Sequence, residues 1–142
     1  MSFRLTYATM FNPPEEMHER FERALATMRG RLGAQMFAEL QKLAARHAVI
    51  GDVRGGKGLF AVVELVSDRA TRAPIAPWPA QSEAMKALLA AARDEGVSFG
   101  SRGNLIILAP PLVIAESELA TGLGVLDRLL TRFFPASLER AS

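Results

Sequence analysis

The chain has no cysteine, so disulfide bonds and thiolate metal sites are excluded within its 142 residues. It has only two histidines, His18 and His47, which stand far apart in the sequence with no cluster of metal ligands around either one. We therefore expect both to be solvated surface residues rather than metal ligands or catalytic groups.

Charge of one sign is barely in excess. The formal net charge is +2, and the basic residues form no block of the kind that marks a nucleic-acid surface. No apolar run approaches the ~18 residues that cross a membrane. The N-terminus also lacks the basic region and apolar run of a secretory signal. We expect no nucleic-acid partner, no membrane partner and a cytoplasmic location.

A long amphipathic stripe occupies the first third of the chain. Apolar residues recur there at steps of three and four, at Met17, Phe21, Leu25, Met28, Leu32, Met36, Leu40 and Leu43. Asn12 and the prolines after it suit a helix start. Gly30 and Gly33 each weaken a helix by about 1 kcal/mol relative to alanine. We therefore expect a break there, with helices near 14–29 and 32–47.

The remaining pattern predicts short strands separated by helices. We expect strand segments at 49–53 and 59–66, a loop at 67–80, a helix at 82–95, strands at 97–99 and 105–109 and a helix at 116–133. The glycines at 55, 56 and 58 predict a bend between the first two strand segments. The predicted fold class is α+β, a small mainly antiparallel sheet of three to four strands with helices packed on it.

The bend also resembles a phosphate-binding loop, because Gly51 is followed after four residues by Gly56 and Lys57. That loop needs a serine or threonine after the lysine and a helix after that. Here Gly58 follows Lys57, and the next residues read as a strand. We expect a glycine bend and not a nucleotide site.

Two arginines are the candidate binding residues. Arg54 and Arg102 each lie in a glycine-flanked turn beside an apolar strand, where a guanidinium can bind a substrate carboxylate through two parallel hydrogen bonds. The alternative is an arginine that binds loop carbonyls and stabilises the turn. We favour that structural role for Arg54 and leave both roles open for Arg102.

Longer runs of sequence resemble one enzyme family. The run from Ile50 to Gly55, the segment from Asp68 to Pro74 and the segment from Asn104 to Ile114 resemble motifs of the class III, fold-type I pyridoxal-phosphate aminotransferases. The similarity covers residues 32–134 and matches the C-terminal small domain of that family. The resemblance is nearest to the ω-amino-acid:pyruvate aminotransferases, including taurine–pyruvate types. Residues 1–31 fit less well, so we assign them to a separate N-terminal segment, with 32–135 as the domain and 136–142 as a frayed tail.

The resemblance implies a division of labour. In this family a large domain supplies the Schiff-base lysine, the aspartate beside the cofactor and most phosphate contacts, so pyridoxal phosphate is implied for the family. We expect no catalytic, cofactor-binding or metal-binding residue in this chain, because its lysines at 42, 57 and 86 lie on polar helix faces or in the bend. Arg102 lies nearest to the arginine with which ω-aminotransferases bind an acid group. Ile107 stands where ornithine- or GABA-type members carry theirs.

Three functions follow from these observations. The first is a truncated or detached aminotransferase small domain that is not catalytic alone. The second is one chain of a split aminotransferase, with a partner chain as its large domain. The third is a non-catalytic oligomerisation or protein-interaction module. Because three amphipathic helices serve a small sheet, we also expect self-association, most simply as a dimer.

Overall fold

The computed structural model describes residues 15–136, which form helices packed on a sheet. The elements are α2 (Glu15–Arg46), β1 (Ile50–Gly55), β2 (Ala61–Asp68), β3 (Ala73–Pro74), α3 (Glu83–Asp94), β4 (Gly100–Arg102), β5 (Leu105–Leu108) and α4 (Glu116–Phe133). The predicted α+β class is confirmed. The predicted irregular segment 1–12, the helix start at Asn12 and most of the predicted tail lie outside the described residues.

Every strand pair in the sheet is antiparallel. The strand order is β1-β2-β5-β4, and the short β3 pairs with the end of β2 inside the segment predicted to be a loop. The sheet therefore has one strand more than the predicted maximum. β1 and β4 form its two edges, so residues that are distant in sequence meet across β2 and β5.

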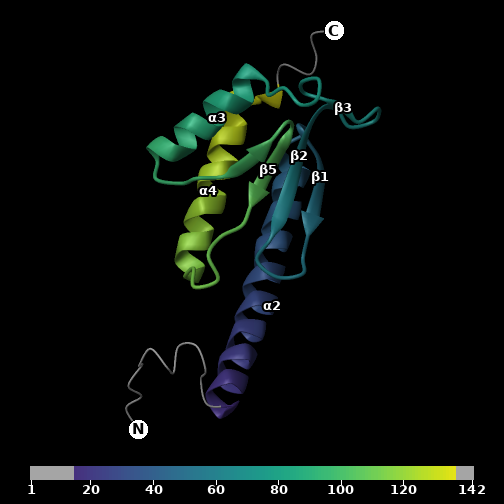
Figure 1. The fold of residues 1–142 in the computed structure, drawn as a ribbon. Coiled ribbons are helices and arrows are strands. Elements are labelled where there is room, and N and C mark those ends of the chain that lie inside the picture. The colour runs from purple at the N-terminus through teal and green to yellow at the C-terminus, as the bar shows by residue number, and fades with distance from the viewer. Residues whose placement is uncertain (1–14, 137–142) are drawn as a thin grey trace.

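The core lies on one face of this sheet. Along β2 the side chains of Ala61, Val63 and Leu65 are fully buried, whereas the residues that alternate with them, Val62 and Glu64, are only half buried. This alternation is typical of a strand with one covered face. The inner face meets the apolar stripes of all three described helices in a single hydrophobic cluster. Figure 1 shows α2 along β1 and β2, with α3 and α4 near β5.

The ends of α3 and α4 follow the sequence signals closely. Ser82 caps α3, because its hydroxyl oxygen accepts a hydrogen bond from the Met85 amide at 3.2 Å. Gly96, at φ 81°, follows the last turn in the left-handed conformation. α4 starts after Ala115, which has no capping side chain, but the Glu118 carboxylate accepts from the Ala115 amide at 2.9 Å. Both predicted helices are confirmed to within one residue.

The predicted strand at 97–99 is wrong. The chain leaves α3 with the Val97 amide still donating to the Ala92 carbonyl at 2.9 Å, so these residues continue the helix exit. Val97 and Phe99 pack on the core, and pairing with β5 begins only at Gly100. The apolar alternation of this segment reflects packing against the core and not a strand.

The predicted break at Gly30 and Gly33 is also wrong, because α2 is continuous from Glu15 to Arg46. A β-carbon built on Gly33 would lie 2.3 Å from the carbonyl oxygen of Gly58, so only glycine lets the helix approach the bend this closely. The cost of glycine in a helix is therefore outweighed by a tertiary contact. The predicted domain boundary between residues 31 and 32 falls within this helix and stays a prediction.

Two alanine substitutions separate these effects. We expect Gly33→Ala to lower the free energy of unfolding by about 1–3 kcal/mol, because the new methyl group collides with backbone atoms that cannot move aside. Gly30→Ala is the matched control, since a β-carbon at position 30 would have no neighbour within 4 Å and the change should raise stability by up to about 1 kcal/mol. Urea denaturation followed by circular dichroism measures both. Equal stabilisation by the two changes would contradict the close approach.

Candidate functional site

The outer face of the sheet carries both candidate arginines. The register places Arg102, Leu105, Glu64 and Asp52 in one row across the four strands. The row two positions along contains Gly100, Ile107, Val62 and Arg54. The arginines therefore share a face but stand on opposite edge strands, which are about 14 Å apart at the usual strand spacing, and they lie two residues apart along the strand direction. They do not form one binding site by themselves.

Arg54 is engaged by carboxylates of its own sheet. Its Nη1 donates to Asp52 Oδ2 at 2.9 Å and to Glu64 Oε2 at 2.8 Å. The hydrogen bond to Glu64 raises the pKa of Arg54 above its ordinary value, and the charges of both acids add to it. Asp52 lies on β1 with Arg54, so the contact with Glu64 is the one that links β1 to β2.

Arg102 has different surroundings. Its side chain is exposed, and no ion pair joins it to a carboxylate within residues 15–136. Its guanidinium carbon lies 5.7 Å from the centre of the Trp78 ring, within the range of a cation–π contact. The residue opposite it on β5 is Leu105, which offers no charge. Arg102 therefore presents an uncompensated cation beside an aromatic surface.

Trp78 is a site residue that sequence reasoning missed. A β-carbon on Gly103 would lie 2.5 Å from two carbons of the indole ring, so the ring rests directly on the turn between β4 and β5. Asn104, which is 6% exposed, donates from its amide nitrogen to the Ala76 carbonyl at 3.2 Å and fastens the Trp78 loop to that turn. The contact depends on tertiary packing, and the only sequence signal is a tryptophan among prolines.

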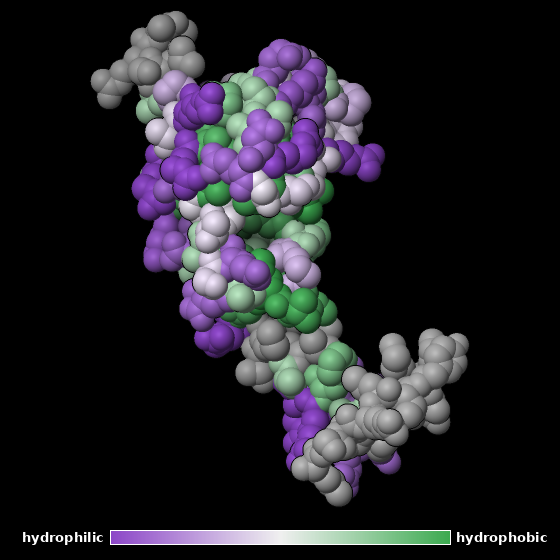
Figure 2. Space-filling view, turned by 90° about the vertical axis from the view of Figure 1, so that its left-hand side faces the viewer, coloured by the Kyte–Doolittle hydropathy of each residue, from purple (hydrophilic) through white to green (hydrophobic). Residues whose placement is uncertain are grey.

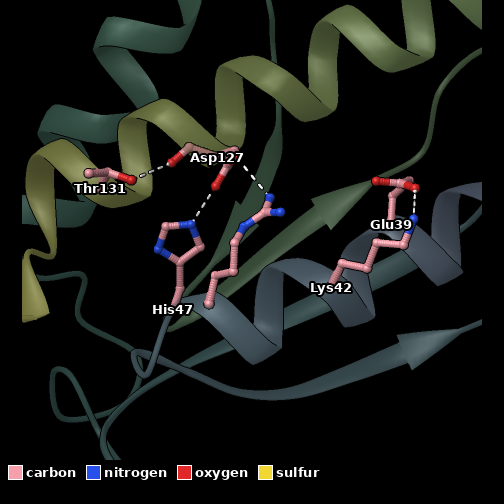
Figure 3. Close-up of polar contacts among 6 residues, drawn as sticks. Glu39, Lys42, His47, Asp127 and Thr131 are labelled. Atoms are coloured by element: carbon pink, nitrogen blue, oxygen red, sulfur yellow. Dashed lines mark hydrogen bonds and ion pairs between the residues drawn. The ribbon is translucent and has the colours of Figure 1, made fainter.

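The prediction of a solvated surface role is wrong for His47. This residue is only 9% exposed, and its Nε2 lies 2.6 Å from Oδ1 of Asp127 on α4. Arg46 donates to the other oxygen of the same carboxylate at 2.8 Å, while Thr131 donates to the Asp127 carbonyl. Figure 3 shows the cluster between the end of α2 and α4. It links two helices, and its only hydroxyl is bound to a carbonyl.

The segment from Asp68 to Pro74 also has a structural explanation. Arg69 donates to the carbonyls of Ala44, His47 and Ile50, at the end of α2 and the start of β1. Asp68 holds this turn, and the hydrogen bonds from the Ala70 amide and the Thr71 hydroxyl lower the pKa of its carboxyl. Arg69 therefore supplies donors to carbonyls at the junction of α2 and β1, among them that of Ala44 in the last turn of the helix.

The described lysines do not fit a pyridoxal-phosphate site. A Schiff-base lysine must be held against the cofactor, next to an acid for the pyridinium nitrogen. Lys42 and Lys86 are exposed and pair with Glu39 and Glu83 on their own helices, at 2.6 and 2.7 Å. Lys57 is exposed in the glycine bend. No group of three or more potential metal ligands occurs within residues 15–136 either.

A groove of about 580 Å³ lies on another side of the molecule. Its walls come from the exit of α3, the end of β5 and the first turns of α4, and they include Val97, Phe99 and Ile114. Figure 2 looks at this side and shows apolar side chains interrupting the polar surface. Leu112 and Val113, next to the groove, are 38% and 83% exposed.

None of the helices within residues 15–136 combines the length and the hydropathy of a membrane-spanning segment.

The comparison with known families is decisive. A family described as "Aminotransferase class-III" matches residues 16–130. The chain belongs to the class III aminotransferases. The resemblance identified from its motifs is thereby confirmed, and the matched region contains most of α2 as well as the sheet.

Class III relatives show how much of such a protein is present. The taurine–pyruvate aminotransferase of Rhodobacter capsulatus is 38% identical over 118 residues, which are 78% of this chain and 24% of that protein. An amine transaminase from an uncultivated Pseudomonas species, solved in its pyridoxal-phosphate-bound internal aldimine form, superposes with a TM-score of 0.70 at 36% identity. That match covers 79% of this chain and 24% of the other. The chain spans about a quarter of the length of these relatives.

The region that this chain matches is found in proteins that catalyse different reactions. The (R)-1-hydroxy-2-aminoethylphosphonate ammonia-lyase of Vibrio splendidus is 39% identical over 95 residues, which are 66% of this chain and 18% of that protein. A lyase and aminotransferases thus share this part of the family. The residues of this region do not by themselves decide which reaction a class III protein performs.

Removal of the Arg69 side chain tests the assignment of its turn. We expect Arg69→Met to lower the free energy of unfolding by about 1–3 kcal/mol, because several carbonyls lose a charged donor. Arg72→Met is the matched control, since Arg72 is exposed in the same turn and has no partner within residues 15–136. Thermal unfolding of the two variants gives the comparison. An equal effect of both substitutions would argue against the capping role.

Proposed function

We propose that this chain is the small-domain part of a class III aminotransferase that transfers an amino group from an ω-amine to pyruvate or another keto acid. In this proposal it is not catalytic alone. A large-domain polypeptide supplies the cofactor site, and this chain supplies the surface that binds the acid group of the substrate. Residues 32–135 are the proposed domain.

The observation that carries the proposal is the state of Arg102. Its guanidinium is exposed on the outer face of the sheet and unpaired with any described carboxylate. Some exposed arginines elsewhere on the surface, such as Arg46 and Arg128, pair with Asp127 and Glu95, whereas Arg72 does not pair with a described carboxylate. A guanidinium without a carboxylate partner is available to form two parallel bonds with an incoming carboxylate or sulfonate. The relative from Rhodobacter capsulatus carries taurine, a sulfonate, in its name.

Arg54 has a secondary place in the proposal. It also faces outward, but Asp52 and Glu64 already neutralise it, and an anion would have to compete with both. We propose that its contribution to substrate binding is small and that its main effect is on the stability of the β1–β2 bend. Arg102 is then the residue that determines preference for acidic substrates.

The need for a partner rests on the lysines and on the size of the chain. None of the three lysines is held beside an acid in a buried position. The class III relatives are about four times as long as the matched region. A partner chain carrying the remaining portion, or a second copy of this chain in a homo-oligomer, would cover the exposed apolar residues, such as Phe60 at 53% and Trp78 at 58% exposed.

A second candidate function is an interaction module without chemistry. The groove beside α4 favours it, because its walls include apolar side chains and the neighbouring Leu112 and Val113 are exposed. The two functions differ in their response to the cofactor. Partner binding that is unaffected by pyridoxal phosphate supports the module, whereas a split enzyme gains the absorbance of bound cofactor when its two chains are mixed.

The isolated chain should show no aminotransferase activity. Its lysines are exposed and lie either beside glutamates on their own helices or in the glycine bend, so none is positioned to hold the cofactor covalently. The chain is incubated with pyridoxal phosphate, reduced with borohydride and analysed by mass spectrometry, while turnover of an amine with pyruvate is assayed in parallel. Stoichiometric label on one lysine together with turnover would overturn the proposal.

Substitution of Arg102 should affect acidic substrates selectively. The matched region of a taurine–pyruvate relative is replaced by this chain, and the hybrid enzyme is assayed on an acidic and a neutral amine. We expect Arg102→Lys to weaken transition-state binding of the acidic amine by about 1.5–3 kcal/mol, because an ammonium cannot make the two parallel bonds of a guanidinium. The neutral amine should be little affected.

Arg54→Lys is the control for this experiment, since Arg54 lies on the same face with its charge already paired. It should lower the thermal stability of the hybrid without changing the ratio of the two substrates. Equal losses on both substrates after Arg102→Lys would show that Arg102 is structural.

A further inference from the structure

We propose that Trp78 is a positioning residue for the acid-binding site: it holds the Arg102 guanidinium in an extended, preorganised orientation and thereby sets the affinity for anionic substrates. This inference rests on the proposed function of Arg102 as the acid-binding residue. It adds a residue on a different loop and a physical reason for the orientation of the guanidinium.

The Trp78 ring has a fixed place although it is exposed. Its loop is held at two points, because Ser67 donates to the carbonyls of Ala73 and Pro74 and the Asn104 amide donates to the Ala76 carbonyl. Asn104 is 6% exposed, so the anchor of this loop lies in the protein interior. Trp78 is 58% exposed, but its loop is held by the buried side chain of Asn104.

Gly103 lies directly against the indole ring of Trp78. The residue lies at φ 54°, and an added β-carbon would lie 2.5 Å from Cε3 and Cζ3 of the indole. Contacts below 3.0 Å are essentially never made by real β-carbons, so any side chain at this position would displace the ring. Glycine at position 103 therefore allows both the turn between β4 and β5 and the indole against it.

The indole in turn orders Arg102, the residue before that turn. The guanidinium carbon lies 5.7 Å from the ring centre, and its cross-strand neighbour is the uncharged Leu105. An arginine with no partner samples many rotamers, and the loss of that freedom on binding weakens its affinity for an anion. Stacking on the ring removes part of this loss beforehand while it leaves the hydrogen-bond donors of the guanidinium unused.

The test uses the full chain and needs no activity. Uniformly ¹⁵N-labelled protein is titrated with taurine, and with ethanolamine as the probe that lacks an acid group, while the arginine Nε–Hε cross-peaks are followed. Arg102→Gln identifies the Arg102 peak. In the wild type we expect a ring-current shift of this peak and a taurine-dependent change that ethanolamine does not produce. Trp78→Leu should abolish the ring-current shift and weaken taurine binding by about two- to fivefold.

Further variants make the comparison specific. Trp78→Phe keeps an aromatic face and should restore most of the shift and the affinity. Gly103→Ala should act like Trp78→Leu because it displaces the ring without altering either side chain. Gly96→Ala is its matched control, since Gly96 also has a positive φ of 81° but an added β-carbon there would meet no atom within 4 Å. It should behave like the wild type.

The outcomes separate this inference from the proposed function. If Arg102→Gln lowers taurine affinity while Trp78→Leu and Gly103→Ala do not, Arg102 binds the acid and the positioning role of Trp78 is refuted. If Arg102→Gln leaves the affinity unchanged, the proposed function is refuted and the inference with it. Loss of affinity in both Trp78→Leu and Gly103→Ala, with recovery in Trp78→Phe, supports the positioning role.

Discussion

The contact of one glycine with another determines how this domain is arranged. α2 crosses the bend between β1 and β2 so closely that Gly33 meets the backbone of Gly58 directly. From that crossing point the buried side of α2 runs along the inner face of the sheet, through Leu32, Met36 and Leu40. The other described helices complete the cover of the same face. The charged side chains of the sheet are therefore left on its outer face.

This one-sided packing explains why the two candidate arginines share a surface. Side chains alternate along a strand, so burial of Ala61 and Val63 directs Val62 and Glu64 outward. Through the register, that choice also directs Arg54 and Arg102 outward. Their different surroundings then separate their roles, because Arg54 meets two acids and Arg102 meets an indole. The inward packing of one strand thus determines the chemistry available on the opposite face.

The sequence predicts the elements whose signals are local. α3 has a capping serine, a stop glycine and an apolar stripe within or next to its own residues, and α4 has an acidic first turn and an apolar stripe. The predicted bounds of both are confirmed. The wrong predictions depend on distant partners. Glycine propensity predicts a break in α2 because it carries no information on the contact of Gly33 with Gly58. His47 reads as a surface residue because its partner, Asp127, lies on another helix 80 residues away.

The residues of the candidate site also differ in whether local sequence signals or distant contacts identify them. Arg102 could be found from its turn and from the family motifs around it, and the family itself is confirmed. Its position on the same face as Arg54 follows only from a register that runs across four strands. Trp78 could not be found, because its contact with Gly103 joins a proline-rich loop to a turn through packing alone. Periodicity and motifs carry no information on such a contact.

The stacking of Trp78 on the Gly103 turn has an optical consequence. The chain contains a single tryptophan, so all of its indole fluorescence comes from this one point on the surface. An exposed indole beside a guanidinium emits according to the water and charge around it, and a neighbouring polypeptide that covers the ring changes both. The fluorescence of Trp78 therefore reports on the place where the Trp78 loop meets Arg102 on the edge strand β4.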